Sequence, residues 1–423
     1  MLFRFCLYGF LKNQQYYDPF LILVFRHRGL SFAEIGLLIG FREICINLLE
    51  VPTGAVADVL GRRRSMVASM LAYIAAFVIF SGAWRLWVLF GAMAFFAAGE
   101  ALRTGTHKAI IFDWLDRQGR AGEKTHVYGL TRSWSKLGSA VSVIIAAVIV
   151  CFTEDYSAVF LLCLVPYVLN VFNFLSYPAY LDGPRSGHAS VGSIVRTLLA
   201  ALAESLRRRR LRRVLIESMG FEGLYRSAKD YIQPIIKMAA LASPLLLGLD
   251  DRRRTAILIG AVYFLLHVLS SAASRRAGRL SDRAGSDERA GRLLWLADLA
   301  GFALLAVGAL AGLPALMIGA FVMLAVIQNF WRPILVSRCA SLSDPSRMAT
   351  VLSIESQAKS LFIAVVAPLL GWSVDLIATA TANGPGYMAS WRFLPITGLG
   401  VAIPLGMLIV ARRNATAGED LPS

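Results

Sequence analysis

The sequence contains few charged residues and few cysteines. Charged side chains make up only 17% of its 423 residues, whereas 57% are hydrophobic and the mean hydropathy is +0.61. A soluble domain of this length does not carry so apolar a composition, which excludes a soluble enzyme or binding module. The five cysteines lie in or beside apolar segments without metal-ligand spacing. We therefore predict that they are buried small hydrophobic residues and that there is no metal site.

The sequence also lacks the Gly-x-x-x-x-Gly-Lys-Ser/Thr loop that cradles nucleotide phosphates, which excludes ATP as a direct energy source. It has no nucleophile motif. We predict no cofactor and no enzymatic activity. The alternative, a membrane enzyme, would use Asp18, Glu100 or His107 as acid or base groups.

Long apolar segments follow one another almost without interruption. A helix needs about 20 mostly apolar residues to cross a bilayer. The sequence therefore predicts an all-α membrane protein with 12 transmembrane helices in two pseudo-symmetric six-helix bundles. The predicted helices are 2–25, 33–57, 65–83, 87–115, 127–152, 156–181, 214–240, 256–277, 292–312, 314–338, 349–376 and 391–411.

The net charge of +16 reflects membrane topology. Lysine and arginine gather in alternate loops, and this bias places those loops and both termini in the cytoplasm. We therefore predict no nucleic-acid partner. The excess of arginine over lysine (36 to 7) indicates a GC-rich bacterium, and so we predict its cytoplasmic membrane as the location. The basic stretches are Arg62 to Arg64, Arg117 to Lys124, Arg185 to Arg213, Arg275 to Arg292, and Arg412 with Arg413.

One short pattern occurs in both halves of the chain. Gly-x-x-x-Asp-x-x-Gly is found at Gly54, Asp58 and Gly61, followed by Arg62 and Arg63, and again at Gly278, Asp282 and Gly285. The offset of 224 residues, together with 215 between Tyr16 and Tyr231, indicates a duplicated protein. The predicted parts are a first bundle at 1–182, a cytoplasmic linker at 183–213, a second bundle at 214–411 and a tail at 412–423.

The linker contains apolar residues at helical spacing between Ser193 and Arg213 and ends in a run of arginines. This pattern predicts a basic amphipathic helix on the cytoplasmic membrane face, held by anionic lipids. We interpret it as a plain linker, with a lipid sensor as the alternative.

Three stretches resemble the major facilitator superfamily: Glu50 to Arg63, Thr104 to Leu115, and Arg347 to Asp375. The resemblance extends over nearly the whole chain. It implies a monomeric secondary transporter that works by alternating access and binds a small-molecule substrate. The Gly-Pro motif of drug/proton antiporters is missing from helix five, as is the Arg-x-x-x-Gly pattern of their helix four.

In this family the loop between helices two and three is a latch that stabilises the outward-facing state. Carried over by position, Gly54 allows close helix approach, Asp58 lies near a helix N-terminus with Arg62, and Asp113 is an acidic partner at the end of helix four. An aspartate at a helix N-terminus gains from the helix dipole and from a nearby arginine. The alternative is a static topology anchor.

Several predicted helices carry polar stripes, which are costly in a bilayer unless they line a water-filled cavity or are paired. The resemblance implies that helices one, four, seven and ten line the cavity. We predict a substrate-binding and coupling site from Lys12, Gln15, Asp18, Glu100, Arg103, His107, Glu222, Arg226, Lys229, Asp230, Gln233 and Arg332.

The excess of basic groups in these stripes favours an anionic or zwitterionic substrate. Carboxyl groups and His107 are candidates for proton coupling. In the alternative interpretation the stripes are structural ion pairs, such as Glu222 with Arg226 or Glu355 with Lys359. The alternative functions are a multidrug efflux antiporter and a non-transporting membrane receptor or assembly partner.

The topology is testable with fusions. A reporter that is active only in the cytoplasm should be active after Ser423 and inactive when inserted at Arg252, in a predicted external loop. The reverse pattern of activity would refute the predicted orientation.

Overall fold

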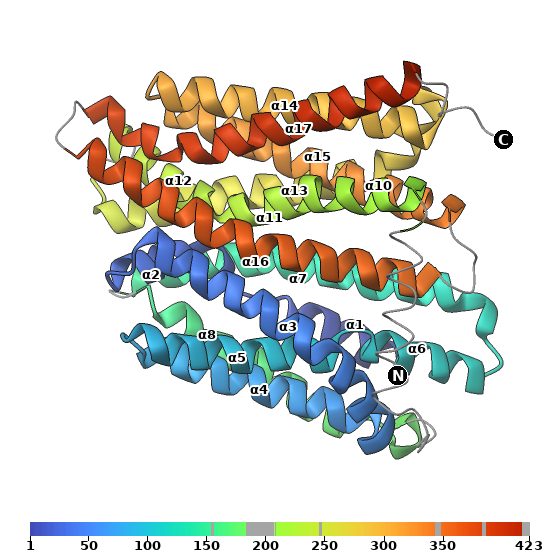
Figure 1. Cartoon of the computed structure of the whole chain (residues 1–423). Helices are drawn as coiled ribbons and strands as arrows, with labels where there is room; N and C mark the ends of the chain where they lie inside the picture. Colours follow the sequence, from blue (N-terminus) through green and yellow to red (C-terminus); the bar gives the residue numbers. More distant parts are fainter. Residues whose placement is uncertain are drawn as a thin grey trace. The chain divides into compact units, whose positions relative to one another are not determined.

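The structure is a computed structural model that describes residues 1–153, 156–182, 207, 209–244, 248–342, 348–382 and 386–416. The described residues are almost entirely helical (Figure 1). Nine of their helices are long and apolar enough to cross a membrane, and each coincides with one predicted segment. The predicted linker helix at 193–213 lies outside the described residues except at 207 and 209–213.

The other three predicted segments contain none of these nine helices, so the count of 12 spans remains a prediction. The first divides into α1 (Leu2–Lys12), the short helix η1 (Asp18–Phe20) and α2 (Leu21–His27). The second forms one helix, α3 (Phe32–Leu60), which contains Arg42, Glu43 and Glu50. The seventh divides into five pieces: α10 (Arg209–Ser218), a π-helical turn (Met219–Gly223), α11 (Leu224–Ala228), η5 (Lys229–Tyr231) and α12 (Ile232–Ala242).

The chain forms two compact units. Unit 1 contains Met1–Leu30, Leu38–Thr197 and Leu249–His267, and unit 2 contains Ser31–Leu37, Leu198–Gly248 and Val268–Ser423. The helices of the first half are α4 (Arg62–Gly82), α5 (Leu86–Arg103), α6 (Thr106–Arg117), α7 (Lys124–Phe152) and α8 (Ala158–Leu175). Those of the second half are α13 (Asp251–Ala284), α14 (Asp287–Leu310), α15 (Pro314–Leu342), α16 (Met348–Ala380) and α17 (Leu394–Thr416), with η6 (Gly386–Phe393) before α17.

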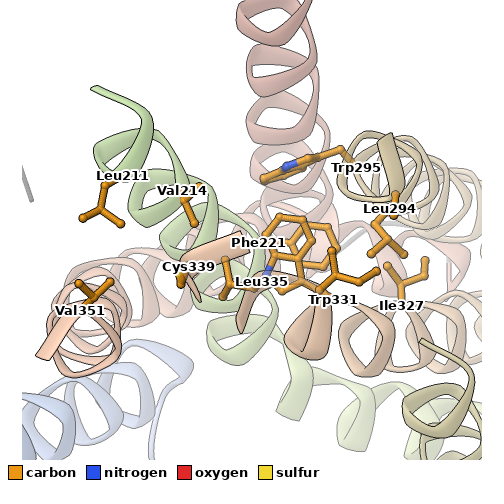
Figure 2. Close-up of a cluster of buried hydrophobic side chains, with 12 residues drawn as sticks. Leu211, Val214, Phe221, Leu294, Trp295, Ile327, Trp331, Leu335, Cys339 and Val351 are labelled. Atoms are coloured by element: carbon orange, nitrogen blue, oxygen red, sulfur yellow. The ribbon is translucent and has the colours of Figure 1, made fainter. Parts of the chain in front are cut away.

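The two halves repeat one packing pattern. In unit 1, α4 packs against α5 and α8, and in unit 2, α14 packs against α15 and α17 (Figure 1). The core of unit 2 includes aromatic rings of three helical segments (Figure 2). Phe221 stacks on Trp331 with ring centroids 4.0 Å apart, and Trp295 meets Phe221 edge-on at 4.9 Å. This core holds the π-helical turn between α14 and α15.

Glycines set the close approach of α1 to α7 in unit 1. A Cβ atom at Gly138 would lie 2.5 Å from the Phe10 carbonyl oxygen, and one at Gly9 would lie 2.7 Å from Ser135 Oγ. Small residues allow membrane helices to approach closely, because packing rather than water exclusion holds them together.

We expect Gly138→Ala to destabilise the protein by about 1–3 kcal/mol, since the added methyl group must push α1 away. Gly129→Ala on the same helix is the control, because a Cβ there meets no atom within 4 Å. The melting temperatures of the purified variants provide the measurement. Equal melting temperatures for both variants would refute the close contact.

Candidate functional site

A charged cluster lies in unit 1 on α1, α4 and α5. Its central carboxylate is Glu100, and Asp18 also interacts electrostatically with Lys12. Glu100 forms an ion pair with Arg103 and lies 4.0 Å from the Lys12 ammonium group. The hydroxyl group of the fully buried Tyr73 donates a hydrogen bond to the same carboxylate. Glu100 is therefore shared by two cations and a hydroxyl group.

A break in the fourth predicted span positions this cluster. α5 ends at Arg103, α6 begins at Thr106, and Gly105 between them has φ +78°, which favours glycine. The break places Glu100 and Arg103 in the last turn of α5. His107 lies beyond the break and packs against the Tyr8 ring at 4.1 Å.

The remaining candidates of the first span lie after α1. Gln15 is in the turn before η1, and Asp18 begins η1. The sequence analysis missed Tyr73, because a single tyrosine in an apolar helix has no pattern that separates it from core residues.

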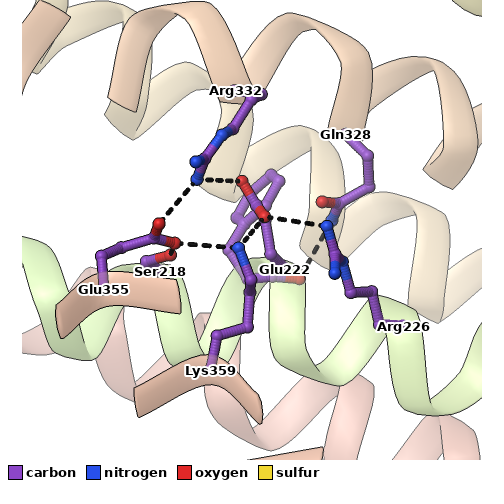
Figure 3. Close-up of polar contacts among 8 residues, drawn as sticks. Ser218, Glu222, Arg226, Gln328, Arg332, Glu355 and Lys359 are labelled. Atoms are coloured by element: carbon purple, nitrogen blue, oxygen red, sulfur yellow. Dashed lines mark hydrogen bonds and ion pairs between the residues drawn. The ribbon is translucent and has the colours of Figure 1, made fainter. Parts of the chain in front are cut away.

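A second cluster lies in unit 2 and joins α15, α16 and the π-helical turn (Figure 3). Glu222 Oε2 accepts from Lys359 Nζ at 2.6 Å, and Glu222 Oε1 accepts from Arg332 Nη1 at 3.3 Å. Glu355 accepts from Arg332 at 2.8 Å and from Lys359 at 3.0 Å, and Ser218 also donates to it. Arg226 is more distant, 3.9 Å from Glu222.

Burial divides this cluster into an enclosed and an open part. The side chains of Glu222, Glu355 and Lys359 are 5%, 0% and 3% exposed, whereas those of Arg332 and Arg226 are 41% and 53% exposed. Within the described part of the chain, three cations accompany two carboxylates. The cluster therefore has a net positive charge, and that charge is presented by the two arginines.

The π-helical turn sets the position of Glu222. A Cβ atom at Gly223 would lie 2.6 Å from the Phe362 ring, so glycine is needed where the turn meets α16. Such turns are frequent at functional sites. The Phe221 carbonyl in this turn accepts a hydrogen bond from Gln328 Nε2 at 3.0 Å.

The structure joins Glu222, Arg226 and Arg332 of the predicted site and gives Lys229 a separate ion pair with Asp230 at 2.6 Å. Gln233 is fully buried. The continuous stripe expected on this helix is interrupted by the π-helical turn and by η5. Sequence reasoning left Glu355 and Lys359 out of the site, although their four-residue spacing marked them as a pair.

A third ionic cluster in unit 2 was not predicted. Arg338 Nη1 donates to Glu217 at 2.6 Å, and its other nitrogens donate to Glu288 at 3.0–3.2 Å. Arg213 also bonds Glu217, at 2.9 Å. The Arg338 side chain is only 3% exposed. It therefore joins α10, α14 and α15 as a buried connection.

The predicted latch is described in part. Gly54 and Asp58 lie in α3, in a stretch whose side chains are outside the described part of the chain. Gly61 has φ +101° and separates α3 from α4, which begins at Arg62.

The carboxylate at the start of α4 is Asp182, which the sequence analysis did not single out. It accepts from the Arg63 backbone N–H at 3.1 Å and fills the space beside Gly61. Asp113 pairs with Arg117 at 3.0 Å.

In the second copy of the motif, Gly278 and Asp282 are exposed on α13, and Gly285 has φ +77°. Ser286 caps α14 by accepting a hydrogen bond from the Arg289 N–H.

One comparison with known proteins shows the family of the chain. A sequence profile described as Major Facilitator Superfamily matches residues 5–368. No curated protein matches the sequence.

Solved structures share the fold at low identity. A mutant of the nucleoside transporter NupG superposes with TM-score 0.78 at 12% identity, covering 96% of this chain and 99% of its own. A POT family transporter in complex with a thioalcohol-conjugated peptide superposes with TM-score 0.70 at 16% identity, covering 97% of this chain and 96% of its own. The POT family transporter in complex with 5-aminolevulinic acid gives 0.70 at 15%, with the same coverage.

Lys359 should be needed for stability, because it lies between two buried carboxylates. We expect Lys359→Met to reduce the free energy of unfolding by about 3–5 kcal/mol, the usual result of removing one partner of a buried ion pair. Arg226→Ala, which removes an exposed side chain, should change it by less than about 1 kcal/mol. Chemical unfolding of the purified variants measures both. Similar losses in the two variants would contradict the division into an enclosed and an open part.

Proposed function

The chain belongs to the Major Facilitator Superfamily and is a multi-pass membrane transporter, and we propose that it moves a small organic anion or zwitterion by alternating access, coupled to protons. The observation that carries this proposal is the excess of cations over carboxylates in the unit 2 cluster, presented by the exposed Arg226 and Arg332.

The two arginines have the chemistry that an anionic substrate needs. A guanidinium group presents a planar fork of donors that matches a carboxylate or a phosphate. Among the described residues, Arg226 is held by a long 3.9 Å contact with Glu222, and its side chain is 53% exposed. It therefore has donors to offer to a substrate. In the unit 1 cluster, Lys12 and Arg103 likewise bring two cations to Glu100.

The same arrangement supports proton coupling. Glu222 contacts three cations, which belong to Arg226, Arg332 and Lys359. A substrate anion that binds the two arginines would remove two of these contacts. The carboxyl group could then take up a proton, which ties substrate binding to protonation. Asp230, paired with Lys229, is a second candidate on the same span.

The structural neighbours agree with a polar organic substrate. They include a nucleoside transporter and POT family transporters bound to a peptide conjugate and to 5-aminolevulinic acid. A multidrug efflux antiporter is the second candidate, but the exposed arginines would repel the cationic compounds typical of that class. The charge clusters also disfavour a non-transporting receptor, because a scaffold has no need of intramembrane charges.

We further propose the cytoplasmic membrane of a bacterium as the location, with both termini in the cytoplasm and the segment Ser193–Arg213 on anionic lipids. This rests on the alternating basic loops. The Gly54–Arg63 motif would act as a latch there, with Asp182 fixing the start of α4.

Counterflow of radiolabelled succinate, 5-aminolevulinic acid, dialanine and uridine in proteoliposomes tests the substrate class. For a transported anion or zwitterion, Arg226→Gln should raise the apparent KM roughly 10- to 150-fold, since a lost charge-assisted hydrogen bond is worth about 1.5–3 kcal/mol. Lys237→Gln is the control, because Lys237 is exposed on α12 of the same span. An unchanged KM in Arg226→Gln would exclude this arginine from the binding site.

A further inference from the structure

The buried carboxyl group of Asp298 belongs to none of the three ionic clusters. Asp298 lies near the middle of α14, is 1% exposed, and neither of its oxygens has a hydrogen-bond partner among the described residues. The buried Glu217, Glu222 and Glu355 differ, because each is bonded to at least two groups. Asp298 therefore needs a separate explanation.

The packing of α14 on α15 shows which residues of α15 are level with Asp298. Trp295 meets Trp331 with ring centroids 5.8 Å apart, and Gly301, two turns along, packs against Leu324. The two helices thus run antiparallel. Asp298 is therefore at the level of Ile327 and Gln328, midway between Leu324 and Trp331 on α15.

Gln328 occupies that level of α15. Its Nε2 donates to the Phe221 carbonyl at 3.0 Å, so its amide oxygen is the group available to accept a further hydrogen bond. An ionised carboxylate has nothing to donate to that oxygen, whereas a protonated one has an O–H group.

The internal repeat shows what this pair corresponds to. α4 and α14 begin at Arg62 and Asp287, an offset of 225 residues, and α5 and α15 begin at Leu86 and Pro314, an offset of 228. Counted from these helix starts, Asp298 corresponds to Tyr73 and Gln328 to Glu100, within the one residue by which the motif offset of 224 differs. In unit 1 the Tyr73 hydroxyl donates to Glu100. In unit 2 the repeat places a carboxyl group where unit 1 has the donor, and an amide where unit 1 has the acceptor.

Among the described residues, no charge near Asp298 favours its ionised form. On α15 the nearest charged side chain is Arg332, which is bonded to Glu222 and Glu355. On α17 the residues from Leu394 to Val410 carry no charge, and on η6 the Arg392 side chain donates to the Ala389 carbonyl. On α14 itself, Glu288 is bonded to Arg338, and Arg292 lies nearly two turns before Asp298. A charged carboxylate without a partner is strongly disfavoured in such a place.

We propose that Asp298 is a proton-binding site of the transport cycle, which holds its proton in a hydrogen bond to the Gln328 amide oxygen. Gln328 lies one turn from Arg332 on α15, and it bonds the residue next to Glu222. A movement of α15 that follows substrate binding at the arginines would separate Gln328 from Asp298. Water entering in place of the amide would take the proton and solvate the carboxylate, since a buried carboxyl group ionises only when water or a cation reaches it. This inference rests on the proton coupling proposed above.

The test uses Asp298→Asn, whose amide can still donate to Gln328 but cannot carry a proton. Proteoliposomes are given a pH gradient of either sign with the four probes named above. We expect the variant to keep the counterflow of the wild-type protein and to lose gradient-driven accumulation. Accumulation equal to the wild type would overturn the role of Asp298. A wild-type protein that performs counterflow but never accumulates a probe would refute proton coupling itself, and with it the role of Asp298 in the cycle.

Infrared spectroscopy of the purified protein tests protonation without any substrate. We expect the wild-type protein to show a protonated-carboxyl absorption that Asp298→Asn lacks. If that variant does not fold, Gln328→Leu provides the second measurement, because removal of the acceptor should shift the same band. Absence of the band from the wild-type protein, or its presence unshifted in Gln328→Leu, would overturn the proposed hydrogen bond.

Discussion

The burial of Glu222 and Glu355 beside Lys359 is the interaction on which the second half of the structure depends. All three side chains are at most 5% exposed. Burying either carboxylate without a cation would cost a large free energy in a bilayer or a protein interior. Each therefore requires cations from another helix, and this requirement ties the π-helical turn to α15 and α16. Arg332 bonds both carboxylates and is still 41% exposed, so the contacts that stabilise the unit leave part of this positive charge accessible.

The two halves solve the problem of intramembrane charge differently. In unit 1, Glu100 is shared by Lys12, Arg103 and the Tyr73 hydroxyl at a helix break. In unit 2, the corresponding helix has Gln328, and the carboxylates come from the π-helical turn and α16. As far as the structure describes it, the unit 2 arrangement leaves one cation in excess. The two halves therefore share a pattern of helix packing, whereas the polar residues at corresponding places differ.

The sequence predicted the helical class, the repeat and nine of the spans, because apolar length and loop charge are local properties. It also identified Glu222, Arg226 and Arg332 from their place in polar stripes. It could not predict the π-helical turn or the break at Gly105, because both depend on contacts with other helices, such as Gly223 with Phe362. Tyr73, Asp182 and Asp298 were missed for the same reason. Each is a single polar residue whose role comes from a partner distant in the sequence or from the absence of one among the described residues.

The central claim is that the arginines of unit 2 bind an anionic group. The most direct measurement is the melting temperature of the purified wild-type protein with succinate, 5-aminolevulinic acid or tetraphenylphosphonium, since a ligand that binds only the folded state raises it. The account predicts a rise with at least one of the two carboxylate compounds and none with the lipophilic cation. A rise with tetraphenylphosphonium, and none with either carboxylate, would contradict it.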